Sequence, residues 1–236
     1  MPGFLLAYIR WVDRFNRRLG RIIMYGIFVM MGILFWSSIS KTFFLPSRWT
    51  LEVAQFALVA YYMLGGPYSI QLGANVRMDL FYGNWTPRQK AWVDFFTVWF
   101  LIFYLAVLFR GAVSSTAYAL GHFGDEPFRF FWELLKAWIS GGTEAARAHL
   151  GFIERSPTAW RPYLWPVKVF ATIGIFLMLL QAISEWLKDI AMIRGIDLRT
   201  NSPAMIDERG HALLLGAGAE VAGAVPEDDK DDGGAR

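Results

Sequence analysis

Four long apolar stretches constrain what this chain can fold into more than any other feature. They cover residues 22–39, about 51–70, 92–109 and about 167–187. Each is long enough to cross the roughly 30 Å hydrocarbon core of a bilayer as a helix. Lipid offers no partner for open backbone groups, so helices are the expected form of all four stretches. Their few charges, such as Glu52, Asp94 and Lys168, lie near the ends, where side chains can reach the membrane interface.

The composition supports a chain that folds in lipid. Hydrophobic residues make up 55% of the 236 residues and charged residues only 18%, whereas a soluble domain carries about 25% charged residues. The formal net charge of +3 is too small to imply nucleic acid as a partner, because the basic residues flank the apolar stretches instead of forming one patch. We therefore predict an all-α membrane protein with four transmembrane helices, additional interfacial helices and the lipid bilayer around them.

The distribution of Lys and Arg predicts the orientation in the membrane. Five arginines precede the first stretch, and basic residues also follow the second and fourth, whereas the link between the first two stretches carries only Lys41 and Arg48. Loops rich in Lys and Arg stay in the cytoplasm, so both termini are expected there. A cleaved signal peptide is the alternative for the first stretch, because Ser38 and Ser40 imitate a cleavage site. We prefer a retained helix because the apolar stretch is longer than a signal peptide requires.

Residues 1–20 are predicted to form an interfacial amphipathic helix ahead of a membrane domain over residues 21–195. Its apolar side chains recur at helical spacing, at Phe4, Tyr8, Val12, Phe15 and Leu19. Such a helix either anchors the chain at the membrane surface or offers a docking surface to a partner subunit. The composition then changes to a polar, Gly/Ala-rich and finally acidic sequence, which predicts a disordered cytoplasmic tail over residues 196–236.

A long insert of about residues 121–165 separates the third and fourth stretches and is expected on the periplasmic side. Asp125-Glu126-Pro127 predicts a helix start, and Gly141-Gly142 predicts its end, with a second short helix from about Thr143. The first of these helices, over about 125–140, is amphipathic with an aromatic apolar face. It either rests among lipid headgroups or packs against a partner protein.

Motifs for catalysis are missing from the sequence. It contains no Cys, and His122, His149 and His211 lie outside the apolar stretches, which argues against thiolate metal sites and against a His-ligated haem. It also has no P-loop, paired-His metalloprotease motif or nucleophile elbow. We therefore expect no enzyme activity, no cofactor and no catalytic or metal-binding residue.

The middle of each apolar stretch is almost wholly apolar. Secondary transporters usually build a substrate site from broken helices at mid-membrane, and the one obvious break here, Gly65-Gly66-Pro67, lies near the end of its stretch. We therefore expect no substrate-binding residue and a chain that positions another membrane protein. Two alternatives remain. The anchor of a redox complex would need His on its helices, and a stand-alone channel would need a polar pore face.

The sequence around the second stretch is similar to a known family. The segment WTLEVAQFALVAYYMLGGPYSIQLGANVRMDLFYG resembles the signature region of the small permease, or Q, subunits of tripartite ATP-independent periplasmic (TRAP) transporters. That pattern has a Glu early in the second helix, a Gly later in it and then a V-R-x-D-like turn, matched here by Glu52, Gly65, Arg77 and Asp79. Residues two apart do not face each other on a helix, so Arg77 and Asp79 either contact different partners or pair through a turn.

A second segment, ERSPTAWRPYLWPVKVFATIGIFLMLLQAISEWLK, resembles the start of the family's fourth helix. The matching positions are Glu154, Ser156, Trp160, Pro162, Trp165, Pro166, Lys168 and Gln181. With the spacing of the four stretches, the resemblance covers roughly residues 10–195. The long third link departs from the shorter family members and looks like the larger Q subunits.

The resemblance implies a function that the composition does not show. In this family a large permease subunit carries an organic acid with sodium in an elevator-like movement, and a periplasmic solute-binding protein delivers the solute. The small subunit enlarges the static scaffold in the bacterial inner membrane and helps dock the binding protein. The resemblance thus implies both proteins as partners, ion-driven symport, and structural or interface roles for Glu52, Gly65, Arg77, Asp79, Trp160, Pro162, Trp165 and Lys168.

Overall fold

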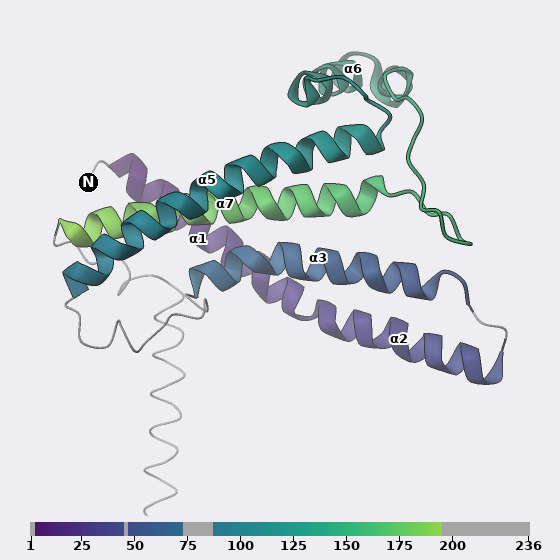
Figure 1. The fold of residues 1–236 in the computed structure, drawn as a ribbon, viewed down its shortest axis with the longest axis horizontal. Helices are drawn as coiled ribbons and strands as arrows, with labels where there is room; N and C mark the ends of the chain where they lie inside the picture. The colour runs from purple at the N-terminus through teal and green to yellow at the C-terminus, as the bar shows by residue number, and fades with distance from the viewer. Residues whose placement is uncertain (1–2, 45–46, 73–86, 195–236) are drawn as a thin grey trace, which may run out of the picture.

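The computed structural model describes residues 3–44, 47–72 and 87–194, and the regular structure of this part of the chain is helical (Figure 1). The helices are α1 (Gly3–Met24), α2 (Gly26–Phe43), α3 (Thr50–Gln71), α5 (Pro87–Ala119), α6 (Pro127–Ala148) and α7 (Trp165–Ile193). An isolated β-bridge joins Arg155 to Tyr163 in the loop before α7. The prediction of an all-α fold is confirmed for these residues.

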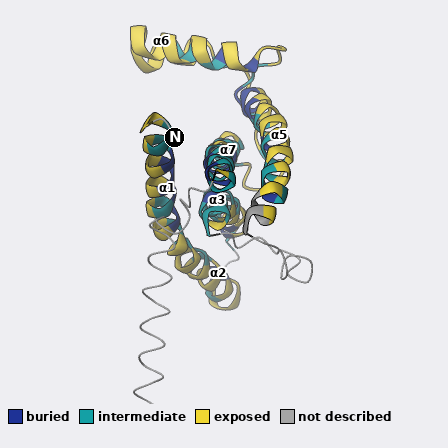
Figure 2. Cartoon of the chain, turned by 90° about the vertical axis from the view of Figure 1, so that its left-hand side faces the viewer, coloured by how far each residue is buried: buried dark blue, intermediate teal, exposed yellow. Residues whose placement is uncertain are grey.

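The central helix of the bundle is α7. It packs against α5, α3 and α1. Seen along the helices, α3 and α7 occupy the middle, with α1 on one side and α5 on the other (Figure 2). Small and polar residues of α7, such as Gly174, Ala182 and Ser184, are buried, whereas most large apolar side chains of α2 and α5 are exposed. This distribution is typical of helices that pack through small residues and are surrounded by lipid or by another membrane protein.

A proline in α3 and a glycine in α7 bring these two helices together. Pro67 lies inside α3 and has no N–H to donate to the carbonyl group of Met63. A Cβ atom on Gly174 would lie 2.5 Å from the oxygen of that carbonyl group, so only glycine fits there. The hydrogen in place of the Cβ points at the carbonyl oxygen, which is the arrangement of a weak Cα–H···O contact between helices.

The helix break predicted at Gly65-Gly66-Pro67 is wrong, because α3 continues to Gln71. Gly66 also faces α7, where a Cβ atom would lie 2.7 Å from Sδ of Met178. The close packing of α7 on this part of α3 covers the backbone group that Pro67 leaves open. A proline is tolerated inside a membrane helix when a neighbouring helix compensates in this way.

Three helical segments are long and apolar enough to cross a membrane, namely Gly3–Phe43, Trp92–Ala119 and Trp165–Ile193. The first combines α1 and α2, which meet at Tyr25. Helix α3 is not among the three, because Glu52, Pro67 and several tyrosines make it less apolar. A fourth crossing by α3 and the cytoplasmic location of both termini therefore remain predictions.

The helix predicted at the N-terminus is present as α1, and its location at the membrane interface stays a prediction. Of the residues of the predicted apolar stripe, Val12 is buried in the bundle, whereas Phe4 is 81% exposed and Phe15 is also exposed. The buried face includes two polar residues, Asp13 and Asn16. An apolar stripe predicts the buried face only where the neighbouring surface is apolar, and here polar side chains of α1 meet polar side chains of α7.

The insert contains α6, which lies near the ends of α5 and α7 that point away from the N-terminus (Figure 1). It begins at Pro127, with Glu126 as N-cap, where the sequence predicts a helix start. The predicted interruption is also present, because Gly142 has φ 69° and ψ −159° and divides α6 into two parts. Gly121, with φ 89°, turns the chain after α5 and lies so close to Gly151 that a Cβ atom would be 2.5 Å from its carbonyl carbon.

Candidate functional site

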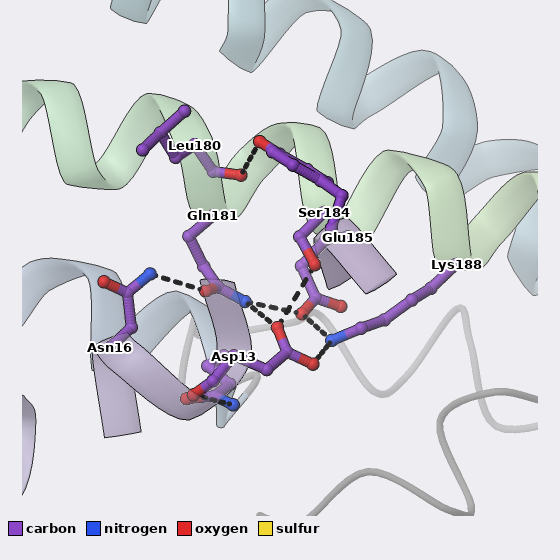
Figure 3. Close-up of polar contacts among 9 residues, drawn as sticks. Asp13, Asn16, Leu180, Gln181, Ser184, Glu185 and Lys188 are labelled. Atoms are coloured by element: carbon purple, nitrogen blue, oxygen red, sulfur yellow. Dashed lines mark hydrogen bonds and ion pairs between the residues drawn. The ribbon is translucent and has the colours of Figure 1, made fainter. Parts of the chain in front are cut away.

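Buried polar side chains join α1 to α7 at the end of the bundle opposite α6 (Figure 3). We call them the polar junction, which consists of Asp13, Asn16, Gln181, Ser184, Glu185 and Lys188. Nζ of Lys188 lies 2.7 Å from Oδ2 of Asp13 and 2.7 Å from Oε1 of Glu185. The side chains of Lys188 and Asp13 are only 3% and 2% exposed. Because a buried charge needs a partner and hydrogen bonds, one ammonium group here holds two carboxylates and links the two helices.

Gln181 connects the charged and neutral members of the polar junction. Its Nε2 donates to Oδ1 of Asp13 and to Oε1 of Glu185, both at 3.0 Å. Its Oε1 accepts a hydrogen bond from Nδ2 of Asn16 at 2.7 Å. Oγ of Ser184 also donates to Oδ1 of Asp13, at 3.1 Å. The Asp13 carboxylate is therefore held by an ammonium, an amide and a hydroxyl, which forms a connected network in a low-dielectric place.

Two further hydrogen bonds extend this contact along α1. Nε2 of Gln71, in α3, donates to the backbone carbonyl of Asp13 at 3.2 Å, so three helices meet there. The hydroxyl of Tyr8 donates to the carbonyl of Leu180 at 3.1 Å. Among the described residues, Oδ1 of Asn16 and Oε1 of Gln71 are buried without a hydrogen-bond partner. The polar groups of this region mostly bind one another, which is the geometry of a clamp between helices.

Four of the predicted site residues lie in or next to a hairpin at the opposite end of the bundle, formed by residues 151–164. The backbone N–H of Ser156 donates to the carbonyl of Pro162 at 2.9 Å and closes the hairpin. Trp160 and Trp165 are exposed. Arg155 stacks on the ring of Tyr163, with the guanidinium carbon 4.4 Å from the ring centroid. The hairpin therefore presents aromatic and basic side chains at this end of the molecule.

Lys168 fastens the hairpin to the bundle. Its Nζ lies 2.6 Å from Oε2 of Glu154 and 3.4 Å from the carbonyl oxygen of Ser115 in α5. It also lies 5.7 Å from the centroid of the Tyr118 ring. The pair is only partly exposed, so solvent screens it less than a surface salt bridge. The structural or interface role that the family resemblance implies for Lys168 stays a prediction, and these contacts are the observations that bear on it.

Glu52 and Gly65, both in α3, lie apart from each other. Glu52 is only 6% exposed, and its Oε2 is buried without a hydrogen-bond partner in the described part of the chain. Gly65 faces α1, where the nearest atom to an added Cβ would be Cγ2 of Ile23 at 3.9 Å. It borders a cavity of about 400 Å³ between α1 and α3. The remaining two candidates, Arg77 and Asp79, lie outside the described residues.

The polar junction is the feature that the sequence prediction missed. Three of its four residues on α7, namely Gln181, Ser184 and Lys188, follow one another at spacings of three and four and so share one face. A polar stripe on an otherwise apolar helix is the available signal for a buried contact with another helix. Within the described residues, no group of three His, Cys, Asp or Glu side chains is placed to hold a metal ion.

The comparison with protein families decides what kind of protein this is. Residues 30–192 match the family model described as "Tripartite ATP-independent periplasmic transporters, DctQ component". The chain belongs to this family. The resemblance drawn from Glu52, Gly65 and the segment before α7 is thus confirmed, and the DctQ component is a membrane subunit of a transporter. The comparison with curated proteins gives no match, and neither does the comparison with solved structures.

The limits of the match matter for the polar junction of this DctQ component. The matched region begins at residue 30, so it contains Gln181, Ser184 and Lys188 but none of α1. Asp13 and Asn16 therefore lie outside the part of the chain that identifies the family. The α7 residues of the clamp thus lie within the matched region, and its α1 residues lie outside it.

Proposed function

We propose that this chain is the static scaffold of a TRAP transporter in the inner membrane of a bacterium. In this proposal α2, α3, α5 and α7 each cross the membrane, and both termini are cytoplasmic. The chain holds the large permease subunit, which carries an organic acid in symport with an ion. Its periplasmic end helps to dock the solute-binding protein. Membership of the DctQ family supports the assignment to a TRAP transporter.

The observation that carries the scaffold role is the polar junction. Lys188 bonds to Asp13 on α1 and to Glu185 on its own helix, and the side chains of Lys188 and Asp13 are buried. Separating α1 from α7 would leave charges without partners in a region of low dielectric, which is strongly unfavourable. The two helices are therefore expected to move as one body. A rigid small subunit is what a large subunit with a moving transport domain needs beside it.

The outer surfaces of α2 and α5 support contact with a large apolar partner. Their exposed large side chains include Phe28, Phe35 and Trp36 on α2, and Trp99, Phe103 and Tyr104 on α5. Lipid covers such surfaces in an isolated subunit, and helix packing replaces lipid in a complex. The assembly is expected to depend on apolar packing of these surfaces, with no polar site for the solute between them.

The hairpin and α6 support the docking role, because both lie at the end of the bundle that is periplasmic in the predicted orientation (Figure 1). One face of α6 is charged. Arg129 pairs with Glu133 at 3.0 Å and with Glu126 at 3.4 Å. The hydrogen bonds to Glu133 and Glu126 raise the pKa of Arg129 above its usual value, so this residue stays charged. A fixed pattern of exposed charges can steer a soluble partner to this surface.

Reconstitution tests the scaffold role. The tagged chain is co-expressed with the products of its neighbouring genes, purified in mild detergent and examined by mass spectrometry. We expect a stoichiometric complex with a large permease subunit. In liposomes, solute uptake is expected only when the large subunit, this chain, the solute-binding protein and an ion gradient are all present. Uptake by this chain alone would contradict the proposal.

Glu52 provides a variant that separates scaffolding from solute choice. Glu52→Ala is expected to reduce the yield of the complex or the rate of uptake several-fold, because the family resemblance implies an interface or structural role for this buried carboxylate, whose Oε2 has no hydrogen-bond partner among the described residues. Gln55→Ala, at an exposed position of the same helix, is the matched control. Competition between solutes measures preference, and a changed preference in Glu52→Ala would argue against a pure scaffold.

A further inference from the structure

The two parts of α6 line one side of an open, apolar cavity of about 610 Å³, and the ends of α5 and α7 line the other side. We call it the α6 cavity. Its lining is Leu120, Phe131, Leu134, Leu135, Trp138, Thr143, Ala146, Arg147, Leu150, Ile153, Trp165 and Val169. The turn at Gly142 allows the second part of α6 to contribute Thr143, Ala146 and Arg147 to the same cavity as the first part. Its volume lies within the range of pockets that hold a small organic ligand.

The position of the α6 cavity points to the membrane interface. Leu120 directly follows the membrane-crossing segment Trp92–Ala119, and Trp165 and Val169 lie in the first turns of the segment Trp165–Ile193. The cavity is therefore at the level where two helices leave the hydrocarbon region. Trp138 and Trp165 line it, and tryptophan is enriched at this level of membrane proteins.

One charge complements the apolar lining. Arg147 is the only charged residue that lines the α6 cavity, and no described residue forms an ion pair with it. The hydroxyl of Thr143 lies on the same part of α6. A guanidinium group beside an apolar cavity at the membrane interface suits a molecule with an anionic phosphate and an apolar chain, since a guanidinium binds phosphate with two parallel hydrogen bonds.

We propose that the α6 cavity binds one phospholipid, with an acyl chain among the apolar residues and the phosphate at Arg147. The lipid fills the space between α6 and the bundle and fixes α6 at the periplasmic surface of the inner membrane. The proposal rests on the membrane orientation given under the proposed function. It gives α6 a lipid partner on its inner face and leaves its charged face, with Arg129, for a protein.

Native mass spectrometry of the isolated chain tests the lipid site. The full chain is purified in detergent, delipidated and titrated with phosphatidylglycerol. We expect one bound lipid. Ala146→Phe fills the cavity and should weaken binding at least about tenfold, because the displaced chain loses its apolar contacts. Arg147→Gln should weaken binding about fivefold, as expected for one basic residue near a lipid phosphate.

Matched variants separate the site from general surface effects. Ala148→Phe lies on the same part of α6 at an exposed position, and Arg161→Gln removes an exposed arginine from the hairpin at the same end. Both should bind phosphatidylglycerol like the unchanged chain. Circular dichroism checks that every variant keeps its helix content. Equal binding by Ala146→Phe and the unchanged chain, or equal losses in the controls, would overturn the proposal.

The same measurement on the whole complex distinguishes other occupants. Retention of one lipid in the complex supports the proposal, whereas release of the lipid on assembly would show that a segment of another subunit fills the α6 cavity. The outcome does not depend on transport. If the isolated chain binds the lipid but forms no active complex with the large subunit, only the scaffold role is contradicted. If the isolated chain does not bind the lipid but the complex transports normally, only the lipid site is contradicted.

Discussion

At the scale of single residues, Lys188 and Asp13 differ in how many charged partners they have in the polar junction. It pairs with two carboxylates, those of Asp13 and Glu185, whereas Asp13 is also held by Gln181 and Ser184. Removing the lysine leaves both carboxylates without the cation that they share. Removing the charge of Asp13 leaves Lys188 paired with Glu185. The two substitutions should therefore have different costs.

We predict that Lys188→Met lowers the free energy of unfolding by about 3–5 kcal/mol, the usual cost of breaking a buried ion pair. Asp13→Asn should cost about 1–3 kcal/mol, because it weakens charge-assisted hydrogen bonds. The double variant should cost less than the sum. Unfolding of the isolated chain in detergent, followed by tryptophan fluorescence, measures these values, with the exposed Lys41→Met as control. Equal and additive costs would show that the polar junction does not form.

At the scale of helices, small residues set the distances. Gly174 lies against a backbone carbonyl of α3, and backbone cannot rotate away as a flexible side chain can. Gly66 instead faces the end of Met178, which can move. The α3–α7 contact should thus tolerate changes at Gly66 better than changes at Gly174.

We predict that Gly174→Ala destabilises the isolated chain by about 1–3 kcal/mol, the usual cost of overpacking. Gly111→Ala, inside α5 with open space around it, is the matched control. It should be neutral or stabilising by up to about 1 kcal/mol, because alanine favours helix more than glycine does. Thermal unfolding of both variants measures the difference. A neutral Gly174→Ala would mean that α3 and α7 lie farther apart than described.

The helices themselves could be predicted from the sequence, and their faces could not. Length and apolar character predict a helix over each stretch, and Pro127 and Gly142 predict where α6 begins and turns. The apolar stripe of α1 does not indicate that Asp13 and Asn16 are buried, because their partners come from α7. A pattern within one helix cannot show which distant polar residues it meets. The helix break at Pro67 was predicted wrongly for the same reason, since the contact that compensates the open carbonyl group of Met63 comes from Gly174 of α7.

At the scale of the whole molecule, the number of crossings determines which surfaces face the solute-binding protein. If α3 crosses the membrane, the hairpin of residues 151–164 and the N-terminus lie on opposite sides. If α3 does not cross, the three segments that are apolar enough place them on the same side. The side of the membrane on which α6 lies therefore depends on whether α3 crosses.

The absence of Cys from the sequence allows a direct test of topology. We predict that Thr158→Cys, in the hairpin, reacts with a membrane-impermeant maleimide in intact spheroplasts. Arg14→Cys, on the exposed face of α1, should react only after the membrane is permeabilised. Labelling is read on gels, with the unchanged Cys-free chain as the blank. Reaction of both variants under the same condition would exclude four crossings.

The polar junction joins α1 to α7, the first and last helices of the described residues, and Gln181 and its hydrogen-bond partner Asp13 are 168 residues apart. During synthesis, the Asp13 carboxylate must wait until the ribosome has produced almost the entire membrane domain. Closure of the junction thus occurs only after α2, α3, α5 and α6 have been synthesised. A chain that stops before Gln181 would lack the three side chains of α7 that hold the Asp13 carboxylate.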